Sequence, residues 1–286
     1  MDLPDAVDQQ DPLDIDIAQE VNGCLAARFA QQAIRELNLS QEAKNILQLP
    51  VPQERWKCPE CGRKTATLFC PLCIKGVLPL PERIQLGLEV HILRHPREPA
   101  SKSSAAGLPL LADDIHCHDL GSATITDYLG NLLSREGMWV VYPSPHAVPT
   151  SCVDWSKVSS IMLIDCRWAQ ANGVVRDHPA LTNMPAIRLE TSARSMFWRR
   201  GFAENETQGF VSTAECLRLL LRERAKALGH AEEPLDHLLL FFAQQHQIIT
   251  QYYAESQSGK CCPWCVEEDR RRRIRKGTTN KAILAT

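Results

Sequence analysis

The chain has 286 residues, of which 44% are hydrophobic and 23% charged, a composition typical of a soluble globular protein with one large domain or two ordinary ones. It contains no apolar run long enough to span a bilayer, and residues 1–5 lack the basic and apolar regions of a signal peptide. We therefore expect an intracellular protein. Twelve cysteines in that setting indicate reduced thiols and metal ligation, with no disulfide-linked partner.

The net charge of −2 conceals two oppositely charged ends. Residues 1–16 carry six Asp and no Lys or Arg, whereas residues 270–276 carry six basic side chains. The rest of the chain is nearly balanced, with 26 basic and 28 acidic residues. This distribution predicts a polyanionic partner that the protein meets mainly at one end.

The amino-terminal part divides into a disordered head and a helical segment. Residues 1–16 are rich in Asp and contain two prolines, so we expect them to be disordered. In residues 17–54, apolar side chains recur at every fourth position from Val21 to Leu37, which predicts a helix. Ser40 predicts the start of a second short helix. We expect both helices to pack on the body of the protein.

Two C-x-x-C pairs occupy residues 55–80, with eight residues between them. Four thiolates at this spacing can surround one zinc ion as a tetrahedron, with each sulfur about 2.3 Å from the metal. Four unligated thiols are the less favoured alternative, because so short a segment has no core of its own without metal. Four cysteines leave no open coordination position, so the zinc ion should not be catalytic. We expect a structural zinc ion, although a site that binds substrate is the open alternative. The ligands of the ion are Cys58, Cys61, Cys70 and Cys73.

Residues 81–258 alternate strand patterns with helix patterns, which indicates an α/β domain. The expected strands are residues 86–93, 115–118, 138–142, 161–164 and 186–189. The expected helices are residues 125–135, 213–228 and 235–253.

Polar side chains follow two of these strands. His95, Glu98 and Lys102 come after the first strand, in a loop that the proline following His95 keeps extended. A single loop histidine is more often structural, but this one is accompanied by a carboxylate, an amine and small residues that would let a ligand approach. Ser144 lies between two prolines in the turn after the strand at 138–142.

The apolar run 161–164 predicts a buried strand that ends at Asp165, with Trp168 three residues later. In open α/β sheets, ligands bind outside the carboxyl ends of the strands, so both side chains are placed for chemistry. An ordinary alternative makes Asp165 the N-cap of the next helix and buries Trp168 in the core.

Two further stretches suit anionic ligands. Residues 194–200 interleave basic and aromatic side chains, which suits phosphate contact and base stacking, although Phe197 and Trp198 could equally belong to the core. Ser212 and Glu215 form a capping box, which is sufficient as a purely structural role. The helix amino terminus that they expose would nevertheless bind a carboxylate or phosphate well.

The tail combines three cysteines with the basic run. Cys261, Cys262 and Cys265 make half a metal site without a clear fourth ligand. The basic run at 270–276 is too dense to pack, so it is a nuclear-import signal, an RNA contact or both.

Taken together and in order, six elements resemble the DTW-domain family, the tRNA-uridine aminocarboxypropyltransferases, and in particular its eukaryotic branch. The resemblance covers roughly residues 55–254. One position departs from the family's D-x-T-W motif, because Arg167 stands in place of the threonine. The six elements are the twin C-x-x-C knuckles, His95-Pro-x-Glu98 with Lys102-Ser103, Pro143-Ser144, Asp165-x-x-Trp168, Phe197-Trp198-Arg199 and Ser212-Thr213-x-Glu215.

The resemblance implies a SPOUT-like fold, which is a mostly parallel sheet with a knotted carboxy-terminal half that binds S-adenosylmethionine in a bent shape. Residues 81–258 would form this catalytic domain, and residues 259–286 a Cys/Arg-rich tail. The implied reaction moves the 3-amino-3-carboxypropyl group of S-adenosylmethionine to N3 of a uridine in tRNA and releases methylthioadenosine. From the expected intracellular setting and the candidate import signal, we expect the protein in the nucleus, the cytoplasm or both.

The resemblance also assigns roles to residues. Asp165 is the expected general base, and Trp168 is expected to stack on the target uracil or wall off the cofactor. The side chains expected to bind S-adenosylmethionine are His95, Glu98, Lys102, Ser144, Ser212, Thr213 and Glu215. Within the region of resemblance, the side chains expected to contact RNA are Arg167, Arg194, Trp198 and Arg199. The basic run beyond it adds Arg270, Arg271, Arg272 and Arg273 as expected RNA contacts, because of its charge.

Two alternatives remain open at this point. A related methyltransferase would use the same co-substrate and release S-adenosylhomocysteine. A zinc-containing RNA-binding protein without catalysis would bind tRNA and not S-adenosylmethionine, and Arg167 is the sequence feature that suggests it.

Overall fold

The computed structural model describes residues 25–52, 54–76, 80–121, 125–193, 195–197, 211–230 and 234–255. The predicted acidic head, the three tail cysteines and the basic run therefore lie outside the described residues. No helix within these ranges is both long enough and apolar enough to cross a bilayer.

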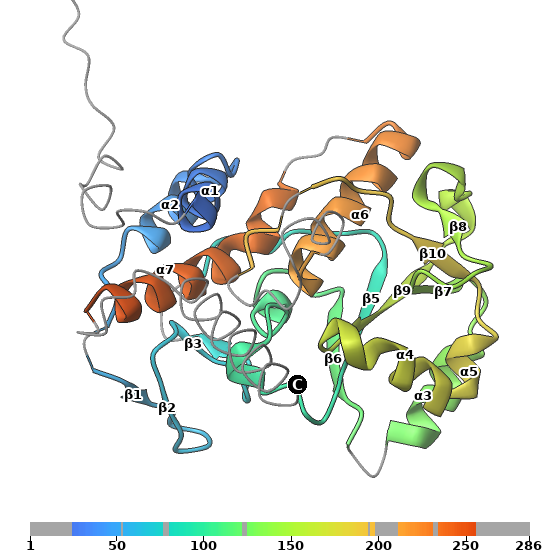
Figure 1. Cartoon of the computed structure of the whole chain (residues 1–286), viewed down its shortest axis with the longest axis horizontal. Helices are drawn as coiled ribbons and strands as arrows, with labels where there is room; N and C mark the ends of the chain where they lie inside the picture. The colour runs from blue at the N-terminus through green and yellow to red at the C-terminus, as the bar shows by residue number, and fades with distance from the viewer. Residues whose placement is uncertain are drawn as a thin grey trace, which may run out of the picture.

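A parallel six-stranded sheet organises the described part of the chain (Figure 1). Its spatial order is β6-β5-β9-β7-β10-β8, and each neighbouring pair is parallel. The predicted α/β class with a mostly parallel sheet is thus confirmed. The strands are β5 (Glu89–Arg94), β6 (Ile115–Asp119), β7 (Met138–Val141), β8 (Val148–Pro149), β9 (Ser160–Asp165) and β10 (Ala186–Arg188).

Side chains of the central strands alternate between two apolar layers, because successive residues of a strand point to opposite faces. Ile161 and Leu163 of β9 belong to one buried cluster, and Met162 between them belongs to the other. Since both faces are covered, the strand is a nearly continuous apolar run. The apolar run at residues 161–164 therefore forms a buried strand, as its pattern predicts.

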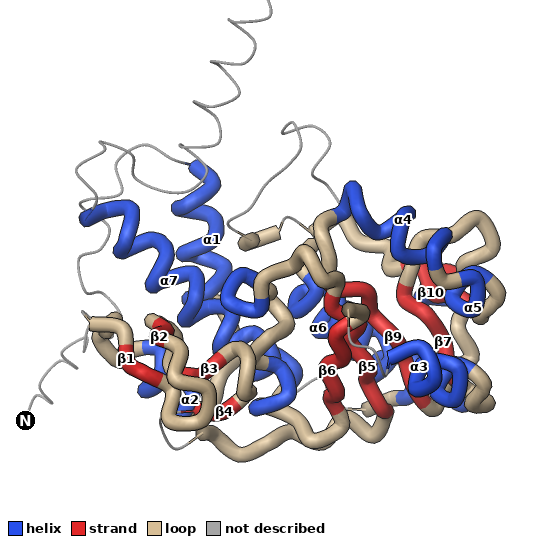
Figure 2. The backbone as a smooth tube through the Cα atoms, turned by 90° about the horizontal axis from the view of Figure 1, so that it is seen from below, coloured by secondary structure: helices blue, strands red, loops and turns tan. Residues whose placement is uncertain are grey.

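Helices cover both faces of the sheet (Figures 1 and 2). The first face packs against α6 (Thr213–Leu228) and belongs to the same buried cluster as residues of α7 (Leu240–Glu255). The second face packs against α3 (Ile125–Leu133), α4 (Trp168–Asp177) and α5 (Pro179–Thr182). Short 3₁₀ turns connect these elements: η2 (Ala100–Lys102), η3 (Leu108–Leu110), η4 (Thr150–Cys152), η5 (Trp155–Lys157) and η7 (Leu235–Leu239).

The amino-terminal helices pack on the body, as predicted. They are α1 (Leu25–Arg35) and α2 (Gln41–Leu47), and α2 contacts α7. The hydroxyl of Ser40 accepts a hydrogen bond from the N–H of Ala43, which confirms the predicted start of α2. The last helix differs from the prediction because residues 235–239 form a 3₁₀ turn before α7 begins.

The capping box of α6 is confirmed. The hydroxyl of Ser212 accepts from the N–H of Glu215, and the carboxylate of Glu215 accepts from the N–H of Ser212 at 2.8 Å. The helix ends at Gly229, whose φ of +68° closes the last turn in the left-handed conformation that glycine adopts readily.

Two small hairpins carry the C-x-x-C pairs. Strand β1 (Trp56–Lys57) pairs with β2 (Lys64–Thr65), and β3 (Phe69–Cys70) pairs with β4 (Lys75–Gly76). The ring of Phe69 lies 4.8 Å from that of Phe241 in α7, centroid to centroid. This aromatic pair packs the hairpin of β3 and β4 against the body of the protein.

Two glycine substitutions test how closely Phe241 of α7 packs against Gly107. A Cβ atom at Gly107 would lie 2.6 Å from the Cβ of Phe241, so Gly107→Ala should lower the free energy of unfolding by about 1–3 kcal/mol through overpacking. Gly130 is exposed in α3, and no described atom lies within 4 Å of a Cβ built there. Gly130→Ala should raise the free energy of unfolding by about 0.5–1 kcal/mol. Urea unfolding of both variants measures the difference, and equal effects would contradict the packing described.

Candidate functional site

The carboxylate of Asp165 lies at the carboxyl end of β9 and is only 4% exposed. The hydroxyl of Ser103 donates to its Oδ2 at 2.6 Å, and the hydroxyl of Thr213 donates to its Oδ1 at 2.8 Å. The first donor follows η2 and the second begins α6. One buried carboxylate therefore joins three segments that are far apart in the sequence.

Burial raises the pKa of Asp165 above that of an ordinary aspartate. The hydroxyls of Ser103 and Thr213 and the charge of Arg94 act in the opposite direction, and the nearby carboxylate of Glu98 adds to the increase. Desolvation is the largest of these effects, so Asp165 holds a proton more readily than an exposed aspartate does.

The loop after β5 lies directly beside Asp165. The backbone N–H of His95 donates to the carbonyl of Asp165 at 3.0 Å, which continues the β5–β9 pairing by one residue. The Nδ1 atom of His95 accepts from the N–H of Arg97 at 3.0 Å. Glu98 is buried, and Lys102 is exposed at the end of η2. Two members of the predicted polar cluster, His95 and Glu98, therefore lie near the end of β9.

An ion pair that sequence reasoning missed closes the same edge of the sheet. Arg94 donates to Asp119 from Nε at 2.6 Å and from Nη2 at 2.9 Å, which ties the carboxyl end of β5 to that of β6. In the strand register, Arg94 is also opposite Asp165. The guanidinium therefore lies between two carboxylates, an arrangement that only the strand order reveals.

Side chains and backbone groups of the protein form hydrogen bonds with the amino end of α6. The N–H of Ala214 donates to the hydroxyl of Ser104 at 3.3 Å. The buried carboxylate of Glu215 accepts from the hydroxyl of Ser195 and from the N–H of Met196, both at 2.7 Å, in addition to its capping contact. Glu215 therefore positions the segment at residues 195–197 against the start of the helix.

The ordinary alternative for the central motif is wrong on both counts. The N-cap of α4 is Arg167, not Asp165, and the N–H of Arg167 donates to Oε1 of Gln170 at 3.3 Å. Trp168 does not fill the core but is 40% exposed at the first position of α4. Arg167 is exposed as well. An aromatic ring and a guanidinium thus face solvent within three residues of the buried carboxylate.

The remaining predicted residues are less closely joined to Asp165. The hydroxyl of Ser144, in the turn after β7, is buried and has no hydrogen-bond partner among the residues that the structure describes. A ligand atom could supply that partner. The ring of Phe197 lies 6.1 Å from that of Phe242, centroid to centroid, so the core alternative is correct for Phe197. Arg194, Trp198 and Arg199 lie outside the described residues.

Ser103 and Ser104 lie in the candidate site, and sequence reasoning did not assign them to it. Their hydroxyls bond to Asp165 and to the amino end of α6, respectively. Ser103 follows Lys102 in one of the six elements of the family resemblance, so its position was marked by the sequence. The direction of the side chain did not follow from it.

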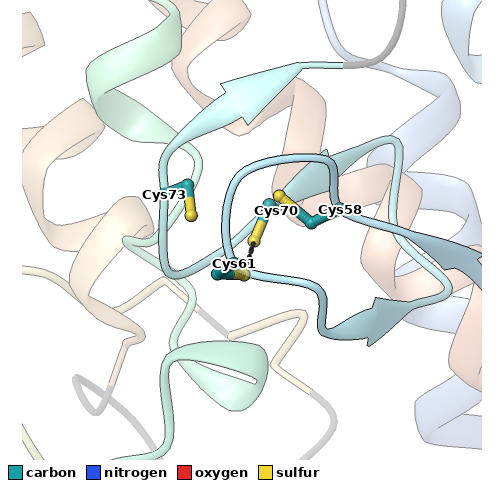
Figure 3. Close-up of side chains that lie close together, drawn as sticks. All are labelled: Cys58, Cys61, Cys70 and Cys73. Carbon is teal, nitrogen blue, oxygen red and sulfur yellow. Dashed lines mark hydrogen bonds between the residues drawn. The ribbon is translucent and has the colours of Figure 1, made fainter.

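The four cysteines of the C-x-x-C pairs form a second site, in the two small hairpins. Figure 3 shows their side chains gathered around one point. All four sulfur atoms lie within 4.8 Å of one another, and those of Cys61 and Cys70 are 3.7 Å apart. This cluster is close enough to bind one metal ion.

The two knuckles share one backbone shape. The N–H of Gly62 donates to the carbonyl of Cys58 at 2.9 Å, and the N–H of Ile74 donates to the carbonyl of Cys70 at 2.8 Å. Both donors have positive φ, +69° for Gly62 and +51° for Ile74. The second knuckle therefore has a β-branched residue where the first has glycine.

The thiols of this cluster influence one another. The backbone N–H of Cys61 lowers the pKa of Cys58 to about 7, whereas the contact with the Cys61 thiol raises the pKa of Cys73 to about 12. Like charges this close oppose each other, so the four thiols cannot all ionise unless a cation compensates them.

Comparison with known proteins shows the family to which this sequence belongs. The DTW domain matches residues 55–247, more than half of the chain. The tRNA-uridine aminocarboxypropyltransferase 1 of Xenopus laevis is 23% identical over 266 residues, 78% of this chain and 89% of that protein. The tRNA-uridine aminocarboxypropyltransferase 2 of Drosophila melanogaster is 28% identical over 180 residues, 59% of this chain and 68% of that protein.

Among solved structures, the SAM-dependent rRNA:acp-transferase Tsr3 from Vulcanisaeta distributa aligns with a TM-score of 0.35 and 19% identity. The alignment covers 59% of this chain and 82% of that one. The match to the DTW domain extends from the first C-x-x-C pair into α7 and includes Asp165. The chain therefore belongs to the DTW-domain family.

Proposed function

We propose that the protein transfers the 3-amino-3-carboxypropyl group of S-adenosylmethionine to N3 of a uridine in tRNA. The observation that carries the proposal is the buried carboxylate of Asp165, which Ser103 and Thr213 hold at the carboxyl edge of the sheet, beside the exposed ring of Trp168. The names of the relatives in the same family support this activity.

The reaction needs a base because uracil N3 carries a proton. In our proposal N3 attacks the carbon attached to the sulfonium, the carbon–sulfur bond breaks, and its electron pair neutralises the sulfur to give methylthioadenosine. The N3 proton passes to Asp165. Burial raises the pKa of Asp165 and so improves it as a base. The hydroxyls of Ser103 and Thr213 hold the carboxylate in place, while each oxygen keeps a second lone pair.

The exposed side chains around this carboxylate suit the two substrates. Trp168 is 40% exposed, so a uracil can reach its ring to stack, and the exposed Arg167 beside it can contact a phosphate. We propose that Lys102 and Ser144 donate to the methionine part of S-adenosylmethionine. In this proposal the binding site for S-adenosylmethionine also includes His95, Glu98, Ser212, Thr213 and Glu215.

We also propose that the sheet is SPOUT-like, with a knotted carboxy-terminal half. The strand order supports this, because the late strand β9 lies between β5 and β7, and β10 lies between β7 and β8. The contact of Thr213 with Asp165 brings α6 back to the same edge. The catalytic domain would then comprise residues 81–258.

Asp165→Asn tests the base. The asparagine keeps the size of the side chain but cannot take the N3 proton, so the single-turnover rate should fall by about 10²–10⁴-fold. Binding of tRNA and S-adenosylmethionine should change much less. Methylthioadenosine release is measured against time, and Asp177→Asn, an exposed site in α4, is the matched control. A near-normal rate in Asp165→Asn would remove Asp165 as the base.

Two further readouts extend this test. Because the proton-accepting form is the carboxylate, the rate should fall on acidification, and at a higher pH than for an ordinary aspartate. S-adenosylhomocysteine measured in the same samples distinguishes the methyltransferase. Its release by the unmodified protein would reject the proposed reaction, whereas tRNA binding without either product would favour the non-catalytic alternative.

We propose that the cysteine cluster holds one structural zinc ion. A tetrahedron with zinc–sulfur bonds of about 2.3 Å has sulfur atoms about 3.8 Å apart, and Cys61 and Cys70 are 3.7 Å apart. Cys61→Ser should lower the zinc content and the thermal stability, because metal binding in such a segment is folding free energy. Elemental analysis and thermal unfolding check this, with Cys152→Ser as control. Full zinc content with unchanged stability in Cys61→Ser would refute the assignment.

We propose that the basic run at residues 270–276 attracts tRNA without regard to sequence, in a protein of the nucleus, the cytoplasm or both. Replacing Arg270, Arg271, Arg272 and Arg273 by glutamine should weaken tRNA binding and flatten its dependence on salt, because fewer phosphate contacts release fewer counterions. Filter binding at several salt concentrations gives the slope. An unchanged slope would leave the run with a localisation role only, which a fluorescent fusion of the same variant would reveal.

A further inference from the structure

Three histidines lie side by side on one face of the sheet, where β5 meets β6. His91 is opposite His116 in the strand register, and His118 is two residues further along β6. The ring of His91 lies 5.3 Å from that of His116 and 5.5 Å from that of His118, centroid to centroid. His91 points to the same side as Leu93, whereas Asp165 points toward α6. The cluster is therefore separate from the candidate active site and from the cysteine cluster.

Two of the imidazoles already face each other at the separation of two ligands of one ion. The Nδ1 atom of His91 and the Nε2 atom of His118 are 3.2 Å apart. If each nitrogen is about 2.05 Å from a zinc ion, that separation corresponds to an angle of about 100° at the metal, close to tetrahedral. Without metal, the same two nitrogens form a hydrogen bond between neutral imidazoles.

The second nitrogen of His91 has the environment typical of a metal-bound histidine. Its Nε2 atom is 3.4 Å from Oε2 of Glu89, and it has no hydrogen-bond partner in the described part of the chain. Metal-bound histidines usually direct their other nitrogen to a carboxylate, which fixes the tautomer and the ring orientation. Glu89 is itself held by Arg135 at 3.1 Å.

We propose that His91, His116 and His118 bind one divalent transition-metal ion, with zinc as the best fit and water as the fourth ligand. Three imidazoles and one open position form a common zinc site. His91 is only 2% exposed and is fixed by its strand, whereas His116 is exposed, and its ring nitrogens do not lie together with those of the other two histidines in this structure. In our proposal the ring of His116 turns toward the other two when the ion binds. Such an ion would fasten the strand β6 to β5, next to the ion pair between Arg94 and Asp119.

Metal stoichiometry of the full-length protein tests the proposal. The unmodified protein, dialysed against micromolar zinc, should retain one ion more than His116→Ala. Because His116 is exposed, its replacement leaves the packing intact. His230→Ala removes another exposed histidine, next to the end of α6, and should retain as many ions as the unmodified protein. Equal zinc content in His116→Ala and the unmodified protein would overturn the proposal.

Cobalt substitution identifies the ligand atoms of the extra ion. The cysteine cluster and any site formed by Cys261, Cys262 and Cys265 bind through sulfur and give thiolate-to-cobalt charge-transfer bands. The histidine site should give ligand-field bands without them, and these should disappear in His116→Ala. Glu89→Gln should weaken binding at this site by about 10–100-fold without changing the number of sites. An extra ion with thiolate bands only would also overturn the proposal.

Discussion

The compensation of one buried negative charge governs the arrangement around the candidate active site. A carboxylate taken from water must be supplied with hydrogen bonds, or it destabilises the fold. Asp165 obtains them from Ser103, 62 residues earlier, and from Thr213, 48 residues later. The end of the central strand, the loop after η2 and the start of α6 therefore form together. Without the hydroxyl of Ser103 or of Thr213, Asp165 would hold the remaining segment at this edge by one hydrogen bond only.

Polar chemistry and apolar packing are separated in this sheet. Both faces are closed by apolar side chains from α6 on one side and from α3, α4 and α5 on the other. The carboxyl edge instead carries Arg94 and Asp119 in an ion pair and Asp165 between two hydroxyls. Because the covered faces already bury the strands, the loops at that edge are available for substrates. Trp168 and Arg167, both exposed, follow the buried carboxylate at this edge.

The features that sequence reasoning predicted well are local ones. The capping box of Ser212 and Glu215 involves residues three apart, and the apolar run of β9 depends only on its own side chains, so the pattern was enough for both. The contact between Ser103 and Asp165 depends on the strand order, and no pattern predicted that order. Trp168 shows the same limit, because exposure of a large aromatic residue is decided by what packs over it.

The two cysteine knuckles, although alike in sequence, are unequal in backbone energy. Gly62 takes its positive φ without cost, whereas Ile74 takes the same conformation at a cost of about 1–2 kcal/mol, because its side chain crowds the backbone there. The contact that holds Ile74 in place comes from the carbonyl of Cys70. If the cluster holds a metal ion, as we propose, loss of the ion would leave the second knuckle with a backbone cost that the first does not carry. We therefore expect the second knuckle to change shape before the first, because of a side chain that binds no metal.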